Sequence, residues 1–227
     1  MGFMEGTMSR LRLSSANRRA SIVAAARTVF ACYGLEGART QQIAKAAGIS
    51  EALLFQHFAS KTHLYRAVLR DVIVDQNRTF RAFGAVEPST DGLLEMVLRT
   101  VRHAMLGPRA SNSESMRIVV GSLAADGHYA RLVYRRSLRL AAPSLSRALD
   151  AAAAEGGLVG RPIAVANAVA FLEHVGTMLM IARSHARPVV TYGGDDIVLM
   201  RDAIAFCARG IGIDPDRVDR FVESLNA

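Results

Sequence analysis

The chain has 227 residues, of which 51% are hydrophobic and 21% are charged, proportions that are ordinary for a folded soluble protein. This composition excludes a chain that is disordered over most of its length. The formal net charge is +8. Residues 1–70 hold ten Lys and Arg against three acids, a net of +7, whereas residues 71–227 hold eighteen against seventeen. A polyanionic partner explains this uneven distribution best, and a merely solvated basic face is the alternative.

Two cysteines, Cys32 and Cys207, lie far apart in apolar helical patterns. They predict no disulfide framework and suit a reducing cytoplasm, where we expect the protein to reside. For Cys207, a redox-sensing role is the alternative to a buried structural thiol, which is commoner.

Motifs of the common enzyme classes are missing from the sequence. It has no GxGxxG, no P-loop, no HExxH, no CxxC and no GxSxG. His57 and His63 have no nearby cysteine or paired carboxylate that would complete a metal site. We therefore expect no enzymatic activity, no metal and no cofactor.

Residues 1–14 mix small polar and basic residues without a helical stripe or a long apolar run. We expect a flexible N-terminal arm here and no signal peptide. An alternative role for Arg10 and Arg12 is contact with a DNA minor groove.

Residues 15–60 are predicted to form a three-helix domain whose last two helices are short. Ile43, Ala44 and Ala47 form an apolar stripe, and Gly48 follows where a helix end needs positive φ. Ser50 can cap the backbone N–H groups of the next helix. This arrangement is that of a helix-turn-helix.

The second of these short helices has an inward and an outward side. Leu54 and Phe58, four residues apart, are expected to face inward. The outer surface, which suits a major groove, is then formed by Glu51, Ala52, Leu53, Phe55, Gln56 and His57.

This stretch resembles the TetR family of bacterial transcriptional repressors. The agreement runs without a gap over about residues 18–66 and comprises Phe30, Gly34, Thr40, Ile43, Ala44, Ala47, Gly48, Ile49, Ser50, Leu54, Phe55, His57, Phe58, Lys61 and Leu64. Two positions depart from the family. Phe55 stands where a tyrosine is common, and Leu53 where a serine or threonine is common, so two possible phosphate contacts are lost. Either the operator offers apolar surface to Phe55 and Leu53, or other residues make the phosphate contacts.

The resemblance implies that this domain binds an operator. We expect Gln41, Glu51, Gln56 and His57 near base edges, with Glu51 accepting from cytosine N4 and a glutamine pairing with adenine. Thr40, Lys61 and Arg39 are expected on phosphates. The full predicted DNA-binding set is Arg39, Thr40, Gln41, Ser50, Glu51, Ala52, Leu53, Phe55, Gln56, His57 and Lys61.

After Lys61 the sequence reads as one helix after another, which predicts an all-α fold with a second, helical domain over residues 61–227. Pro143 should kink or break the fourth of these helices. The predicted helices span residues 61–83, 90–105, 113–125, 128–155, 162–182, 197–209 and 215–225.

Residues 162–182 are mostly apolar and long enough to cross a bilayer, but they include Glu173 and His174 as well as the polar Asn167 and Thr177. The central carboxylate favours a buried interface helix instead. Its stripe is Ala168, Leu172, Val175 and Leu179. A second apolar helix lies in residues 195–210. The two helices, within segments 162–184 and 195–210, predict a C2 homodimer with a four-helix interface, which the resemblance also implies.

The resemblance further implies a ligand cavity inside the helical domain. Mostly apolar surroundings favour a moderately hydrophobic effector. Candidate lining residues, each of which has a core residue as the alternative interpretation, are His103, Met116, Tyr129, Tyr134, His174 and Met178.

Three functions remain open on the sequence alone. The leading one is a dimeric repressor that binds a pseudo-palindromic operator and is released by a small molecule. The second is a regulator of the same fold that is controlled by a protein partner or takes no small molecule. The third is a helical enzyme or metal-binding bundle.

Overall fold

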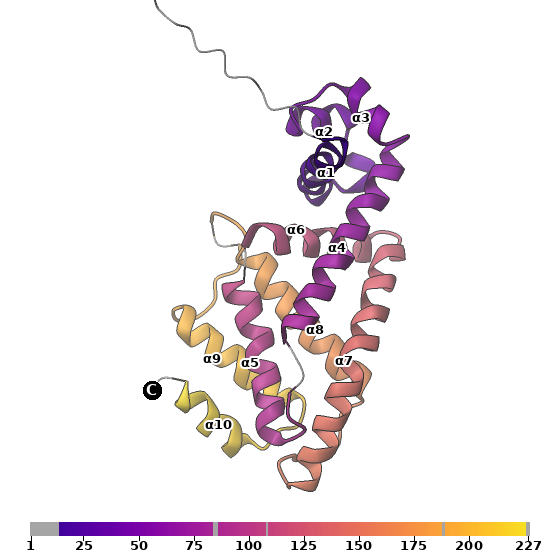
Figure 1. The fold of residues 1–227 in the computed structure, drawn as a ribbon. Coiled ribbons are helices and arrows are strands. Elements are labelled where there is room, and N and C mark those ends of the chain that lie inside the picture. Colours follow the sequence, from indigo (N-terminus) through magenta and orange to yellow (C-terminus); the bar gives the residue numbers. More distant parts are fainter. Residues whose placement is uncertain (1–13, 84–85, 108, 188, 226–227) are drawn as a thin grey trace, which may run out of the picture. The chain divides into compact units, whose positions relative to one another are not determined.

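The computed structural model describes residues 14–83, 86–107, 109–187 and 189–225 (Figure 1). Within these ranges the regular structure is α-helical, apart from an isolated antiparallel bridge between Leu158 and Ile213. The predicted all-α fold is therefore confirmed. The helices are α1 (Ser15–Gly37), α2 (Thr40–Ala46), α3 (Glu51–His57), α4 (Lys61–Phe83), α5 (Thr90–Leu106), α6 (Arg109–Ala124), α7 (His128–Ala154), α8 (Val165–Ala182), α9 (Asp196–Gly210) and α10 (Pro215–Ser224).

The chain divides into two compact units, Met1–Arg70 and Asp71–Ala227. The division falls inside α4, after Arg70, whereas the sequence placed the domain boundary after Ser60. The reason is that the first turns of α4 bury Leu64 and Val68 completely, as part of the first unit's core. The predicted arm lies outside the described residues except for Ser14, whose Oγ accepts a hydrogen bond from the Asn17 amide and caps α1.

The core of the first unit forms around α1. Ile22, Ala26 and Phe30 follow one another at intervals of four residues, and none is more than 1% exposed. The Phe30 ring meets the Tyr65 ring edge to face at 4.9 Å between centroids. This packing joins α1 to the start of α4, and α1 in turn packs against α2.

The second unit has α5 at its centre, packed against α7, α8 and α9 (Figure 1). Leu93, Val97 and Val101 recur on one face of α5, and each is at most 1% exposed. Ser89 begins the helix by accepting a hydrogen bond from the Gly92 amide. Since α5 is amphipathic and surrounded, the hydrophobic core of this unit lies along it.

Most helix boundaries agree with the predicted ones to within one residue, and three points differ, one of which is that α8 begins at Val165 and not at Pro162. Helix α7 runs without interruption through Pro143, so a break is excluded. Helix α6 begins at Arg109 and not at Ser113, because its polar first turn carries no apolar periodicity that a sequence pattern could detect.

The apolar stripe predicted on the interface helix packs inside the chain. Ala168, Leu172 and Leu179 are at most 8% exposed and belong to the core. The outer face of α8 instead carries Phe171, 56% exposed, and Met178, 48% exposed. The 3.6-residue period therefore identified a buried face correctly. The prediction that a second subunit covers this face was wrong, because the chain's own core covers it.

Candidate functional site

Helices α2 and α3 are joined by a tight turn at Gly48, whose φ of 65° lies in the left-handed region that favours glycine. The Gly48 amide donates to Lys45 O at 3.1 Å, and the Ile49 amide donates to Ala44 O at 3.0 Å, so two carbonyls at the end of α2 are satisfied. Ser50 Oγ then accepts from the Leu53 amide at 3.2 Å and begins α3. This is the geometry predicted from the sequence.

Helix α3 has one buried and one exposed side. Leu54 is fully buried and Phe58, just after the helix, is 3% exposed, as predicted. The Arg19 guanidinium covers the Phe58 ring at 4.5 Å. The predicted outward residues divide into exposed ones, Glu51, Ala52, Phe55 and Gln56, and half-buried ones, Leu53 and His57.

The first residues of the two short helices are bonded to each other. Thr40 Oγ1 donates a 2.6 Å hydrogen bond to Glu51 Oε1. This bond fixes one oxygen of the carboxylate, and the other remains available for a partner outside the chain.

Two of the predicted phosphate contacts also have roles within the chain. Lys61 Nζ donates to Glu36 O at 3.3 Å and to Ala38 O at 3.2 Å, and so ties the end of α1 to the start of α4. The Arg39 amide donates to Gln42 Oε1 at 2.9 Å, while the Arg39 side chain is exposed. Gln41 is exposed next to it.

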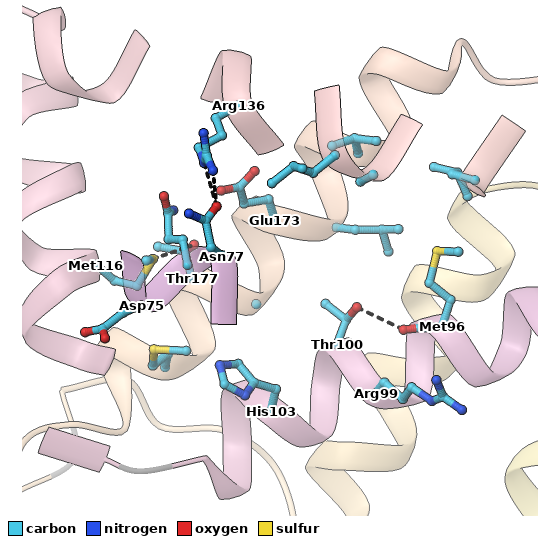
Figure 2. Close-up of a pocket in the computed structure, with 18 of the residues that line it drawn as sticks. Asp75, Asn77, Met96, Arg99, Thr100, His103, Met116, Arg136, Glu173 and Thr177 are labelled. Carbon is cyan, nitrogen blue, oxygen red and sulfur yellow. Dashed lines mark hydrogen bonds between the residues drawn. The ribbon is translucent and has the colours of Figure 1, made fainter. Parts of the chain in front are cut away.

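The second unit contains a cavity of about 400 Å³ with a mostly apolar lining (Figure 2). Helices α4 to α8 all contribute to it. The polar lining residues are Asp75, Gln76, Asn77, Arg99, Thr100, His103, Ser115, Arg136, Ser144, Glu173 and Thr177. A cavity of this size whose lining surface is mostly apolar is typical of a small-molecule site.

Hydrogen bonds join three of the lining helices. Arg136 Nε on α7 donates to Asn77 Oδ1 on α4 at 2.8 Å, a contact visible in Figure 2. Ser137, the next residue on α7, donates to Glu173 Oε1 on α8 at 3.0 Å. Consecutive residues of α7 therefore bind α4 on one side and α8 on the other.

Burial perturbs two titratable groups of the cavity. It raises the pKa of Glu173 to about 7, against the opposing effect of the Ser137 hydrogen bond. It also lowers the pKa of His103, so that the neutral imidazole is favoured there. Glu173 is thus a carboxyl group that can exchange its proton near neutral pH.

Comparison with known proteins agrees with the helix-turn-helix. Residues 22–68 match the family model described as bacterial regulatory proteins, tetR family. The transcriptional regulator RutR of Escherichia coli K12 is 31% identical over 121 residues, which cover 53% of this chain and 57% of RutR. The chain thus aligns with little more than half the length of this curated relative.

Two solved structures share the fold over most of the chain. One is a bacterial regulatory protein in the tetR family from Rhodococcus RHA1, with a TM-score of 0.63 and 22% identity, covering 89% of this chain and 100% of that one. The other is AibR, solved in complex with isovaleryl coenzyme A and operator DNA, with a TM-score of 0.60 and 15% identity, covering 87% and 98%.

The chain belongs to the TetR family. In this TetR-family chain, the helix-turn-helix lies within the residues that match the family model, and the cavity lies in the unit that follows.

The predicted cavity residues are divided by the structure. His103 and Met116 line the cavity. Tyr134 and His174 instead pack ring against ring, at 5.4 Å between centroids, and Tyr129 is buried elsewhere in the core. Met178 lies on the exposed face of α8.

Several cavity residues were not anticipated from the sequence, chiefly Gln76, Arg136 and Glu173. Glu173 carried a usable signal, because a carboxylate in the middle of an apolar helix requires an explanation. Gln76 and Arg136 carried none, since polar residues on amphipathic helices are usually solvated.

The thiol of Cys207 is 6% exposed, and burial raises its pKa to about 11. Because the thiolate is the reactive form, this TetR-family chain holds Cys207 as an inert core residue near neutral pH. Cys32 is exposed.

Helix α8 is long and apolar enough to cross a membrane by length and composition. Only 28% of its residues are buried within the chain, so much of its apolar surface is left uncovered. Among the residues that the structure describes, no cluster of three or more His, Cys, Asp and Glu is placed to hold a metal ion.

Proposed function

We propose that this TetR-family chain is a dimeric transcriptional repressor that binds a pseudo-palindromic DNA operator and is released by a small molecule. The observation that carries the proposal is the outward face of α3, with Glu51, Phe55 and Gln56 exposed on a rigidly packed helix-turn-helix. The net charge of +7 on residues 1–70 supports attraction to DNA phosphates.

In this proposal α3 enters the major groove. Either Gln56 or Gln41 pairs with adenine, Glu51 accepts from cytosine N4 with its remaining oxygen, and Gln41, Gln56 and His57 lie near base edges. Ala52, Leu53 and Phe55 meet apolar surface such as thymine methyl groups. Arg39, Thr40, Ser50 and Lys61 lie toward the phosphates, with Lys61 also holding α1 to α4.

The proposed homodimer forms through α8 and α9, within segments 162–184 and 195–210. Both helices expose large apolar side chains that the chain itself leaves uncovered, Phe171 and Met178 on α8 and Ile197 and Phe206 on α9. Such an exposed set is what a four-helix interface would bury. Two copies of α3 would then require an operator with two half-sites about one DNA turn apart.

The proposed effector occupies the cavity of the second unit. The TetR-fold neighbour AibR was solved with both isovaleryl coenzyme A and operator DNA, which supports a ligand and an operator acting on one protein. Helix α4 belongs to both units, with Lys61 in the first and Gln76 lining the cavity in the second. A ligand that shifts α4 would couple the two sites, by about 1 to 3 kcal/mol if the coupling is typical.

The test is selection of the purified protein against random duplex DNA at about physiological salt, followed by sequencing of the retained DNA. We expect the retained DNA to show a two-fold symmetric consensus. When this consensus is placed upstream of a reporter gene, the protein should repress expression of the reporter. Retention without a consensus, or no retention, would contradict the proposal.

A further inference from the structure

Within the described part of the chain, two buried oxygen atoms of the cavity lining have no hydrogen-bond partner. They are Gln76 Oε1 on α4 and Glu173 Oε2 on α8. Gln76 is only 8% exposed, and Glu173 is partly buried. An unpaired buried acceptor is costly, typically by about 1 to 3 kcal/mol. Both atoms are acceptors, so each requires a hydrogen-bond donor.

Both acceptors line the same cavity, and hydrogen bonds join the helices that carry them to α7. Gln76 precedes Asn77, which accepts from Arg136, and Glu173 accepts through its other oxygen from Ser137. Figure 2 shows Asn77, Arg136 and Glu173 gathered together, with Thr177 beside them. Arg136 and Ser137 are neighbours on α7, so α7 is bonded to both of the helices that carry the free acceptors.

Among the described residues none forms an ion pair with Glu173, although the Arg136 guanidinium lies near it in Figure 2. Arg136 of α7 donates to the Asn77 amide oxygen, and Arg99 of α5 forms a 2.7 Å ion pair with Glu95. Asp75 of α4 adds a second carboxylate to the lining. His103 of α5 has its pKa lowered by burial. On the far side, burial and the Glu173 charge raise the pKa of Tyr134, which contacts the His174 ring.

We infer that the effector is an amphiphilic amine, whose ammonium group donates to Glu173 Oε2 and Gln76 Oε1 while its hydrocarbon part fills the apolar remainder of the cavity. The inference rests on the proposed function in that it names the chemistry of the proposed effector. An ammonium supplies the missing donors and balances the buried carboxylate.

The raised pKa of Glu173 gives the inference a pH signature. An ammonium favours the ionised carboxylate, so binding near neutral pH should release protons from Glu173. For the same reason the affinity should rise with pH. With a pKa of about 7, the ionised fraction of Glu173 rises about tenfold between about pH 6 and about pH 8, and the affinity should follow it.

The test compares three probes of equal chain length, n-octylammonium, n-octanol and octanoate, by calorimetry with the purified full-length protein. Glu173→Gln removes the charge and keeps an acceptor, and Glu223→Gln makes the same change at an exposed position on α10, outside the cavity lining. We expect wild type and Glu223→Gln to bind n-octylammonium at least about tenfold more tightly than the other probes. Glu173→Gln should lose this preference and the proton release measured in buffers of different ionisation enthalpy.

Equal or tighter binding of n-octanol or octanoate, or no saturable binding of any probe, would overturn the inference. So would an ammonium preference that survives in Glu173→Gln. A separate DNA-binding assay distinguishes this failure from failure of the proposed function. If the protein binds no symmetric operator, the repressor proposal fails. The calorimetry still tests independently whether the cavity prefers the ammonium probe.

Discussion

Thr40 Oγ1 donates a 2.6 Å hydrogen bond to Glu51 Oε1, which joins the first residue of α2 to the first residue of α3. The bond spans the Gly48 turn, so it restrains the angle between the two helices as well as the Glu51 carboxylate. Both residues belong to the predicted DNA-binding set, which makes the bond part of the proposed recognition surface.

Thr40→Val keeps the side-chain shape and removes this donor. We expect a loss of about 0.5 to 1 kcal/mol in the free energy of unfolding, at the lower end of hydrogen-bond contributions because the site is partly exposed. Urea denaturation measures this loss. Gln41→Ala, at the adjacent exposed position, is the control and should change stability by less than about 0.5 kcal/mol. Equal losses in the two variants would show that the bond adds no stability.

Gly157 is a position where any side chain is expected to destabilise the second unit. A Cβ there would lie 2.1 Å from Thr90 Oγ1, which is fully buried and donates to Glu155 Oε2 at 2.7 Å. Gly157→Ala should therefore cost about 1 to 3 kcal/mol through overpacking, measured as a lower midpoint of unfolding.

Gly121 provides the matched control for this prediction. It lies inside α6 with open space where a Cβ would be, so Gly121→Ala should stabilise the protein by about 0.5 to 1 kcal/mol. Destabilisation by both changes, or by neither, would contradict the packing described around Thr90.

Glu173 should make the ligand-free protein less stable as pH rises. Its pKa increases from the ordinary value of 4.5 to about 7 on folding, so the folded state binds the proton more tightly than the unfolded state. The resulting stabilisation is fully present below about pH 4.5 and is lost as pH rises through about 7. Relative to Glu173→Gln, wild type should lose up to about 3 kcal/mol over this range, measured by denaturation at several pH values. Parallel pH profiles for the two proteins would contradict the burial of this carboxyl.

Phe206 tests the proposed dimer interface. It is 70% exposed on α9, and Phe206→Glu would place a charge inside the proposed four-helix contact. We expect the dimer to dissociate at least about tenfold more readily in sedimentation velocity experiments. Leu106→Glu changes a residue that is 61% exposed on α5, outside the proposed interface, and should leave the oligomeric state unchanged. An unaltered dimer in Phe206→Glu would place the interface elsewhere.

The sequence predicted well the features that depend on neighbouring residues. Gly48 and Ser50 set the turn and the start of α3 through backbone conformation and capping, which need no distant contact. The bounds of α4, Lys61–Phe83, were predicted correctly for the same reason. The first turn of α6 was missed because its residues are polar and have no periodic apolar partner in the sequence.

The cavity depends on contacts between distant segments, which periodicity does not reveal. Glu173 and His174 are neighbours, yet one helical step of about 100° directs Glu173 into the cavity and His174 toward Tyr134. Residue chemistry alone favoured His174. Similarly, the stripe through Leu172 faces the chain's own core, because the sequence shows that a face is apolar and not which surface covers it.

The most direct test of the central claim, that α3 reads the operator, compares the DNA sequences retained by wild type and by Gln56→Ala. Gln56 is exposed on α3, so its removal should leave the fold intact and cost about 1 to 3 kcal/mol at the base that it contacts. We expect a symmetric wild-type consensus and a variant consensus relaxed at one position in each half-site. An unchanged consensus would contradict the assignment of α3 as the helix that reads the bases.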